Sequence, residues 1–218
     1  MMHVLQPDHA ESYCSPAIQV SSDEFTRKLA DNPDIPYSPF EILGESIVPG
    51  LTNVPAVLQG TFIQATNLGN DLQSLFLFYV PTAPFVFGPS SNKVVLGANF
   101  IDDNLKIFDF TSDFRTQRYL SIRIPAGKTF IVGLQYFINP NAALTAPTPV
   151  GSEAMGNRGI IQLLPSGAGK FLVTATVRQN FIRSLSNPTD IISSTAYSVP
   201  ISTGPIVKGS SATAGLLP

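Results

Sequence analysis

The sequence predicts an all-β protein: an antiparallel β-sandwich or jelly-roll-like fold with one short N-terminal helix and extended arms. Two observations support this fold class. Roughly eight to ten short apolar or alternating runs follow one another closely, with turn residues between them. The 44% hydrophobic fraction is ample for a core. The sequence contains no internal repeat of fixed period, such as a solenoid or a propeller would have.

Residues 1–58 are predicted to be accessory to the core. Residues 1–22 have no periodicity and read as an arm. Residues 22–30 predict a helix, because Ser22 can cap it, acids stand in its first turn and bases in its last. Residues 33–58 are expected to cross the sheet surface as an extended segment, since five prolines disfavour a helix or a central strand: Pro33, Pro36, Pro39, Pro49 and Pro55.

The β-sandwich core is predicted over residues 59–202. Residues 72–80 (LQSLFLFYV) are apolar on both phases, as in a strand that is buried on both faces. Arg118 to Ile138 predicts a hairpin within the main sheet, because an alternating strand meets the turn Pro125-Ala126-Gly127-Lys128 and a second strand follows. Further strands are expected at 61–66, 85–87, 93–96, 105–110, 159–164, 171–177 and 191–199.

Two segments lack strand character. Residues 139–158 form a long loop rich in Pro, Ala and Gly, and loops of that length are usually functional or mobile. Residues 203–218 form a small, apolar tail, which we expect to lie in a groove. If a neighbouring subunit buried the apolar side chains of this tail, they would contribute to a contact; the candidates are Ile206, Val207, Leu216 and Leu217.

Charge is sparse and unevenly distributed. Only 13% of residues are charged, yet residues 1–113 carry 13 acids and 4 bases, whereas residues 114–218 carry 2 acids and 9 bases. Either the halves interleave in one sandwich and neutralise each other, or the molecule has an acidic and a basic face suited to head-to-tail contacts. The interleaved arrangement is favoured, because strands from both halves normally mix in such folds.

Residues suited to catalysis or to cofactor binding are few. The two histidines, His3 and His9, lie in the N-terminal arm, and with Asp8, Glu11 and Cys14 they match no closed zinc spacing. Gly127-Lys128 and Gly169-Lys170 lack the earlier glycine of a phosphate-binding loop and read as turns. The sequence therefore predicts no enzyme, no cofactor and no metal site.

One acidic cluster, Asp102-Asp103-Asn104 with Asp109 and Asp113, offers two interpretations. Paired carboxylates could serve glycoside hydrolysis or hold calcium, but Asp and Asn are also good turn formers, and a solvated turn is the favoured interpretation. Nucleic-acid binding is not predicted: the pI is 5.6, no basic arm exists, and the arginines are sparse, at Arg115, Arg118 and Arg123.

No apolar run is long enough to span a membrane, and the N-terminus shows no signal peptide. An assembly at a surface, in a virion or outside the cell is favoured over a cytoplasmic enzyme. Cys14 is the only cysteine, so it cannot form an internal disulfide, but on an exposed arm it could pair between chains.

Two functions fit these observations. The first is a structural subunit that assembles with copies of itself through its terminal arms, as in a coat, an appendage or a filament. The second is a binding module for carbohydrate or protein that uses the 139–158 loop. The first is favoured, since a surface of low charge suits packing against other protein.

Overall fold

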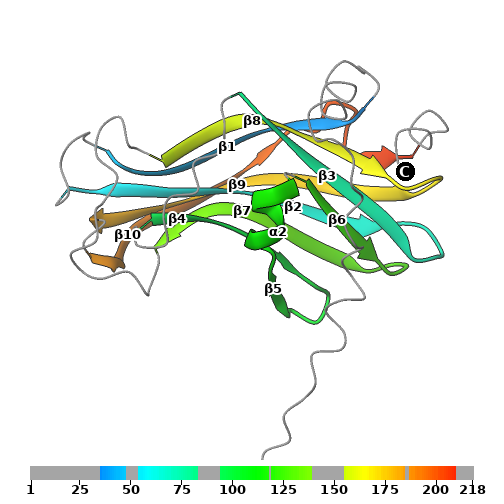
Figure 1. Ribbon diagram of the computed structural model, residues 1–218, viewed down its shortest axis with the longest axis horizontal. Helices are drawn as coiled ribbons and strands as arrows, with labels where there is room; N and C mark the ends of the chain where they lie inside the picture. The colour runs from blue at the N-terminus through cyan, green and yellow to red at the C-terminus, as the bar shows by residue number, and fades with distance from the viewer. Residues whose placement is uncertain are drawn as a thin grey trace, which may run out of the picture.

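The computed structural model describes residues 35–47, 54–82, 94–117, 119–138, 155–184 and 187–209. Over these residues the chain is almost entirely antiparallel β, and its eleven strands form one strongly curled sheet (Figure 1). The elements are β1 Tyr37–Ser46, β2 Ala56–Asn67, β3 Gln73–Pro81, β4 Val94–Ile101, β5 Ile107–Asp109, α2 Thr111–Gln117, β6 Tyr119–Ile124, β7 Thr129–Ile138, β8 Met155–Pro165, β9 Lys170–Ser184, β10 Asn187–Val199 and β11 Ile206–Lys208.

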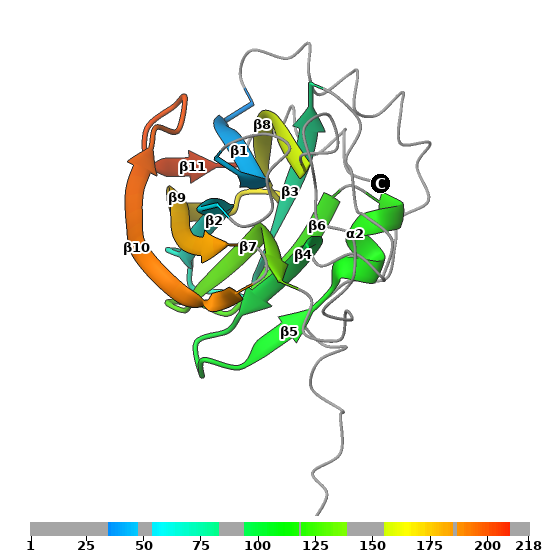
Figure 2. The same cartoon turned by 90° about the vertical axis from the view of Figure 1, so that its left-hand side faces the viewer.

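The sheet divides at β2. Along one edge β2 pairs over its whole length with β9. Along its other edge, Ala56 to Gln59 pair with β1, and Gly60 to Thr66 pair with β7. Two branches result, β1-β8-β3-β6 and β7-β4-β5 (Figure 2). Side chains of both branches contribute to one hydrophobic core cluster.

Strand β3 is buried on both faces, as its apolar run predicts. Leu75, Leu77 and Tyr79 belong to the main core. Phe76 and Phe78 alternate with them and therefore point to the opposite face. There they form a second apolar cluster with Ile35 and Leu164, against which Tyr119 packs.

The predicted 118–138 hairpin is wrong in its pairing. The turn exists, with the Lys128 amide donating to the Pro125 carbonyl at 3.1 Å. However, β6 pairs with β3, whereas β7 pairs with β2 and β4. Asn67 at the end of β2 holds the turn: its side-chain amide donates to the Ile124 carbonyl at 2.8 Å, and its backbone bonds with Gly127 and Lys128. The turn therefore carries the chain from one branch to the other.

The sheet begins earlier than residue 59. β1 lies at 37–46, within the proline-rich segment that the sequence placed outside the sheet. Pro39 is tolerated because β1 pairs with β2 only from Leu43 onward, so at Pro39 the strand has β8 as its single neighbour. A proline, which lacks an N–H donor, fits a strand that is paired on one side only.

The remaining strand predictions are mostly confirmed in position, with bounds that differ by several residues. The predicted helix at 22–30 and the predicted strand at 85–87 lie outside the described residues. The helix α2 was not predicted, since its sequence TSDFRTQ carries one large apolar residue, Phe114, which is fully buried in the core.

The acidic and basic halves of the chain interleave. β1, β2 and β3 from the first half each lie beside strands from the second half, namely β8, β7, β9 and β6. Two ion pairs join an acid of the first half to a base of the second: Glu41–Arg158 at 2.9 Å and Asp103–Lys128 at 2.8 Å. The interleaved interpretation of the charge distribution is therefore favoured over separate charged faces.

Candidate functional site

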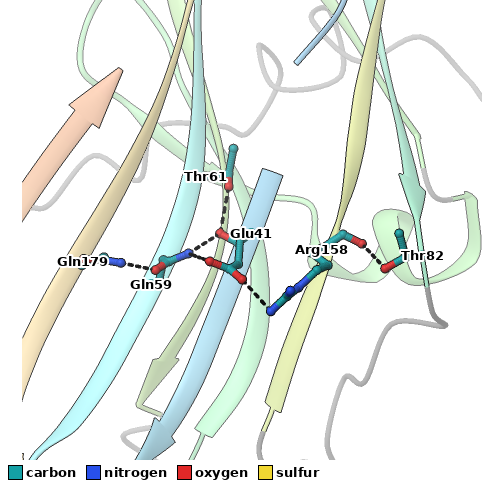
Figure 3. Close-up of polar contacts among 6 residues, drawn as sticks. All are labelled: Glu41, Gln59, Thr61, Thr82, Arg158 and Gln179. Atoms are coloured by element: carbon teal, nitrogen blue, oxygen red, sulfur yellow. Dashed lines mark hydrogen bonds and ion pairs between the residues drawn. The ribbon is translucent and has the colours of Figure 1, made fainter. Parts of the chain in front are cut away.

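A group of polar side chains lies where β1 separates from β2. On the N-terminal side of Leu43, β1 no longer pairs with β2, so the Glu41 carbonyl has no β2 partner in the ladder. Gln59 donates to this carbonyl through Nε2 at 2.8 Å, and the Thr61 hydroxyl lies 3.2 Å from it (Figure 3). We call this point, where β2 exchanges β1 for β7 as its neighbour, the fork. Gln59 and Thr61 are both fully buried, and their side chains replace the backbone partner that the Glu41 carbonyl lacks at the fork.

The polar contacts continue across neighbouring strands. Gln179 on β9 donates to the Gln59 side-chain oxygen, and the Glu41 carboxylate forms the ion pair with Arg158 on β8 (Figure 3). The Arg158 carbonyl accepts from the Thr82 hydroxyl at 2.9 Å. These six residues, the polar row, contain one carboxylate and no histidine or cysteine: Glu41, Gln59, Thr61, Thr82, Arg158 and Gln179. They form hydrogen bonds and an ion pair with one another, which suits joining strands better than catalysis.

An apolar groove borders this row. It has a volume of about 440 Å³, and the Glu41–Arg158 ion pair lies at its edge. Its lining comes from β1, β8, β9 and β10 and includes Phe40, Ile160, Val177, Tyr197 and Val199. The groove is open to solvent and is of a size that accepts a small ligand or a few side chains of a partner.

Strand β10 forms the outermost edge of the curled sheet, on the side away from α2 (Figure 2). It pairs with β9 through residues 187–199 and has no second strand partner among the described residues. Every residue from Ile191 to Ser198 is exposed, on both faces of the strand. Ile191, Ile192 and Tyr197 keep 58%, 51% and 47% of their surface exposed.

The acidic cluster builds turns, as expected, although Asp102 is not solvated as the favoured interpretation required. Asp102 is buried and accepts through Oδ1 from the backbone amides of Asn104 and Lys106, each at 2.9 Å. Asp109 accepts from the Thr111 amide at 2.9 Å and so caps the start of α2. Among the described residues, no three His, Cys, Asp or Glu side chains are grouped to hold a metal ion.

The interaction residues predicted from sequence have different positions. Ile206 and Val207 lie in β11, which pairs with β9 at Leu172 and Phe171. Val207 is fully buried in this chain's own core, so it is not available to a neighbour. Ile206 is partly exposed. Cys14, Leu216 and Leu217 lie outside the described residues.

Other sequence predictions fall partly outside the described residues as well. These include the arm with His3 and His9 and all of the 139–158 loop except its last four residues, which belong to β8. Arg158, from that short part, lines the apolar groove. In the part of the chain that the structure describes, no helix is long and apolar enough to cross a membrane.

The fork residues were missed by sequence reasoning, although a signal was present. Gln59 and Thr61 share one phase of β2 with Val57 and Ile63, which are buried. Polar residues on a buried phase need hydrogen-bond partners, and this requirement points to an interruption of the ladder.

Comparisons of the chain with protein-family models, with curated proteins and with solved structures find no match.

Proposed function

We propose that this protein is a non-enzymatic structural subunit with a jelly-roll core, and that it assembles with copies of itself into a coat, an appendage or a filament. The architecture, the surface chemistry and the outer strand of the sheet each support one part of this proposal.

The order of strand pairing supports the jelly roll. Among the first eight strands, β1 pairs with β8, β2 with β7, β3 with β6 and β4 with β5. This nested order arises when a long antiparallel hairpin wraps around a core, which is how a jelly roll is built. The pairings β3–β8 and β4–β7 then join these pairs side by side. Jelly rolls occur in viral capsid proteins, lectins and cupins, so the architecture alone leaves several functions open.

The observation that carries self-assembly is the exposure of β10. A long edge strand presents unpaired N–H and C=O groups, and proteins that remain monomeric usually protect such edges with lysine, proline or a short length. Residues 191–199 contain no charged residue and no proline. An uncharged edge strand of this kind is stabilised when another chain pairs with its free N–H and C=O groups.

The experiment is the solution mass of the full chain at several concentrations, compared with two truncated proteins. Deletion of residues 1–20 tests the N-terminal arm, and deletion of residues 210–218 tests the tail. The second deletion starts at 210 because β11 contributes Val207 to the core. We expect the full chain to associate and both truncated proteins to fold, with weaker association. A monomeric full chain at all concentrations would refute the proposal.

The apolar groove supports a second candidate, a binding module for carbohydrate or protein. Arg158 from the end of the 139–158 segment and Tyr197 on β10 offer a charged and an aromatic contact at this groove. In this case the full chain is monomeric, and Tyr197→Ala abolishes binding to an array of glycans and peptides.

A further inference from the structure

We infer that the outer edge of β10 is the docking site for β10 of a second copy, in antiparallel orientation about a two-fold axis. The inference rests on the proposed self-assembly and adds a surface that takes part in it beside the terminal segments. The two curled sheets would then continue into each other through the β10–β10 pair.

The first step is the hydrogen-bonding capacity of the edge. β10 pairs with β9 from Ile191 to Val199, and in an antiparallel ladder alternate residues direct their backbone groups to opposite sides. Every second residue of β10 therefore presents its N–H and C=O away from β9. Both faces are open to solvent from residue 191 to residue 198, so nothing on the described chain hinders a strand that approaches in the plane of the sheet.

The second step is self-complementarity. In a two-fold antiparallel pair, each residue faces a residue of the same strand, so any charge would face a charge of the same sign near the axis. No charged side chain occurs between Ile191 and Val207. The charged residue nearest to this segment in β10 is Asp190, immediately before Ile191, and it already forms an ion pair with Arg183 of β9. Ser193, Ser194 and Thr195 lie near the middle of the exposed part of β10, Ile191 to Ser198, and can form hydrogen bonds across the axis.

The third step is the choice of partner. The other strands with one described neighbour are β5 and β11, of three residues each, and β6, of six residues. β5 contains Asp109 and β6 contains Arg123, and the first part of β1 contains Pro39 and Glu41. Among the described strands, the edge that matches β10 in length and in lack of charge is β10 itself.

Cysteine cross-linking tests the geometry directly. In a Cys14→Ser background, which removes the single natural cysteine, one exposed position at a time is changed: Ser193→Cys, Ser194→Cys, Thr195→Cys, Ala196→Cys and Tyr197→Cys. Only the residue on the axis faces its own copy at about 4.5 to 5.5 Å between Cβ atoms, a spacing near that of a disulfide. Each step along the strand moves the two cysteines two residues apart.

We therefore expect the yield of disulfide dimer to peak at one position and to fall steeply within two residues on either side. A charge at the edge provides a second readout. Thr195→Lys places two ammonium groups close to the axis and should weaken association about tenfold or more. Thr174→Lys, at an exposed position of β9 outside the edge, is the matched control and should leave association unchanged.

The outcomes separate this inference from the proposed function. Association that resists Thr195→Lys, with no cross-linking peak, overturns the β10 pairing but leaves self-assembly in place. The β10–β10 pairing is also overturned if no position gives a peak of disulfide dimer and association is lost on deletion of residues 1–20. That result would identify the N-terminal arm as the partner strand. A full chain that stays monomeric overturns both.

Discussion

At the scale of single residues, the polar groups of the interior explain how one strand can serve two branches of a sheet. A strand that changes neighbours leaves carbonyl and amide groups without a ladder, and a buried group of this kind costs free energy. Gln59 and Thr61 supply the missing partners for the Glu41 carbonyl. Their amide and hydroxyl groups are therefore part of the fold itself, although they lie in an otherwise apolar strand.

Gln59→Leu tests this role. The change keeps the approximate volume of the side chain but leaves the half-buried Gln179 amide and the Glu41 carbonyl without the Gln59 amide. We expect the free energy of unfolding, measured by urea denaturation, to fall by about 1 to 3 kcal/mol. Gln64→Leu, at an exposed position of the same strand, should change it by less than about 0.5 kcal/mol. Equal losses in both variants would contradict the role of Gln59.

Tyr79 provides a contrasting case, because its hydroxyl is buried and has no hydrogen-bond partner among the described residues. Its ring packs edge-on against Phe40 and Phe114, with centroids 5.7 Å and 5.1 Å away. Tyr79→Phe keeps both ring contacts and removes the unpartnered group. We expect the free energy of unfolding at pH 7 to rise by about 1 kcal/mol. Tyr197→Phe, on the exposed β10, is the control and should have no effect.

The same variant has a signature in alkaline solution. Burial raises the pKa of Tyr79 and of Tyr136 above the ordinary tyrosine value. Above about pH 10 the unfolded chain loses these phenol protons while the folded chain keeps them, so stability is fully present below that pH and falls as the pH rises. Tyr79→Phe removes one of the two contributions, and its stability should fall less steeply as the pH rises above about 10.

At the scale of elements, the sequence predicts where strands lie better than which strands pair. Alternation in residues 119–124 and the turn at Pro125 to Lys128 are both present as predicted. The partner strand is decided by contacts distant in sequence, such as the β3–β6 ladder and the hydrogen bond from Asn67 to the Ile124 carbonyl, 57 positions away. Local patterns contain no information on such a contact, so a turn that crosses between branches resembles a hairpin.

The fork and the groove were beyond prediction for the same reason. Glu41, Gln59, Arg158 and Gln179 come from four strands, and their proximity depends on the order of strands in the sheet. β1 was missed because five prolines in residues 33–58 disfavour a central strand, whereas Pro39 occupies a part of β1 with a single neighbour. In contrast, the burial of β3 on both faces was predicted correctly, because apolar residues at successive positions are a local feature of the sequence.

Strand β11 gives a prediction at this scale. Deleting residues 204–218 removes the three-residue ladder with β9 and the buried Val207 side chain. Val207→Ala isolates the second effect and should lower the free energy of unfolding by about 1 to 3 kcal/mol. Lys208→Ala, at the exposed next position, should change it by less than about 0.5 kcal/mol. If the 204–218 deletion proves no less stable than the 210–218 deletion, β11 contributes nothing to the core.

At the scale of the whole molecule, the wrapped order of strands decides how charge is distributed. Among the described residues, β1, β2 and β3 of the acidic first half lie beside strands of the basic second half, and two ion pairs join the halves there. In the described residues, the two oppositely charged halves of the sequence are therefore mixed within one sheet. The surface proposed for assembly, the β10 edge, is in turn free of charge from Ile191 to Val199.

This arrangement predicts that assembly depends little on salt. Between about 0.1 M and 1 M NaCl the screening length falls from about 10 Å to about 3 Å, which removes most attraction between exposed charges. Association through the β10 edge relies on backbone hydrogen bonds and uncharged side chains, so the mass measured by light scattering should stay constant over this range. Thr195→Lys should behave differently, because its weakened association comes from repulsion between two like charges, and added salt should partly restore it. Head-to-tail contacts between an acidic and a basic face require the opposite result: the full chain would dissociate as salt is added. Dissociation of that kind would show that assembly uses charged surfaces other than β10.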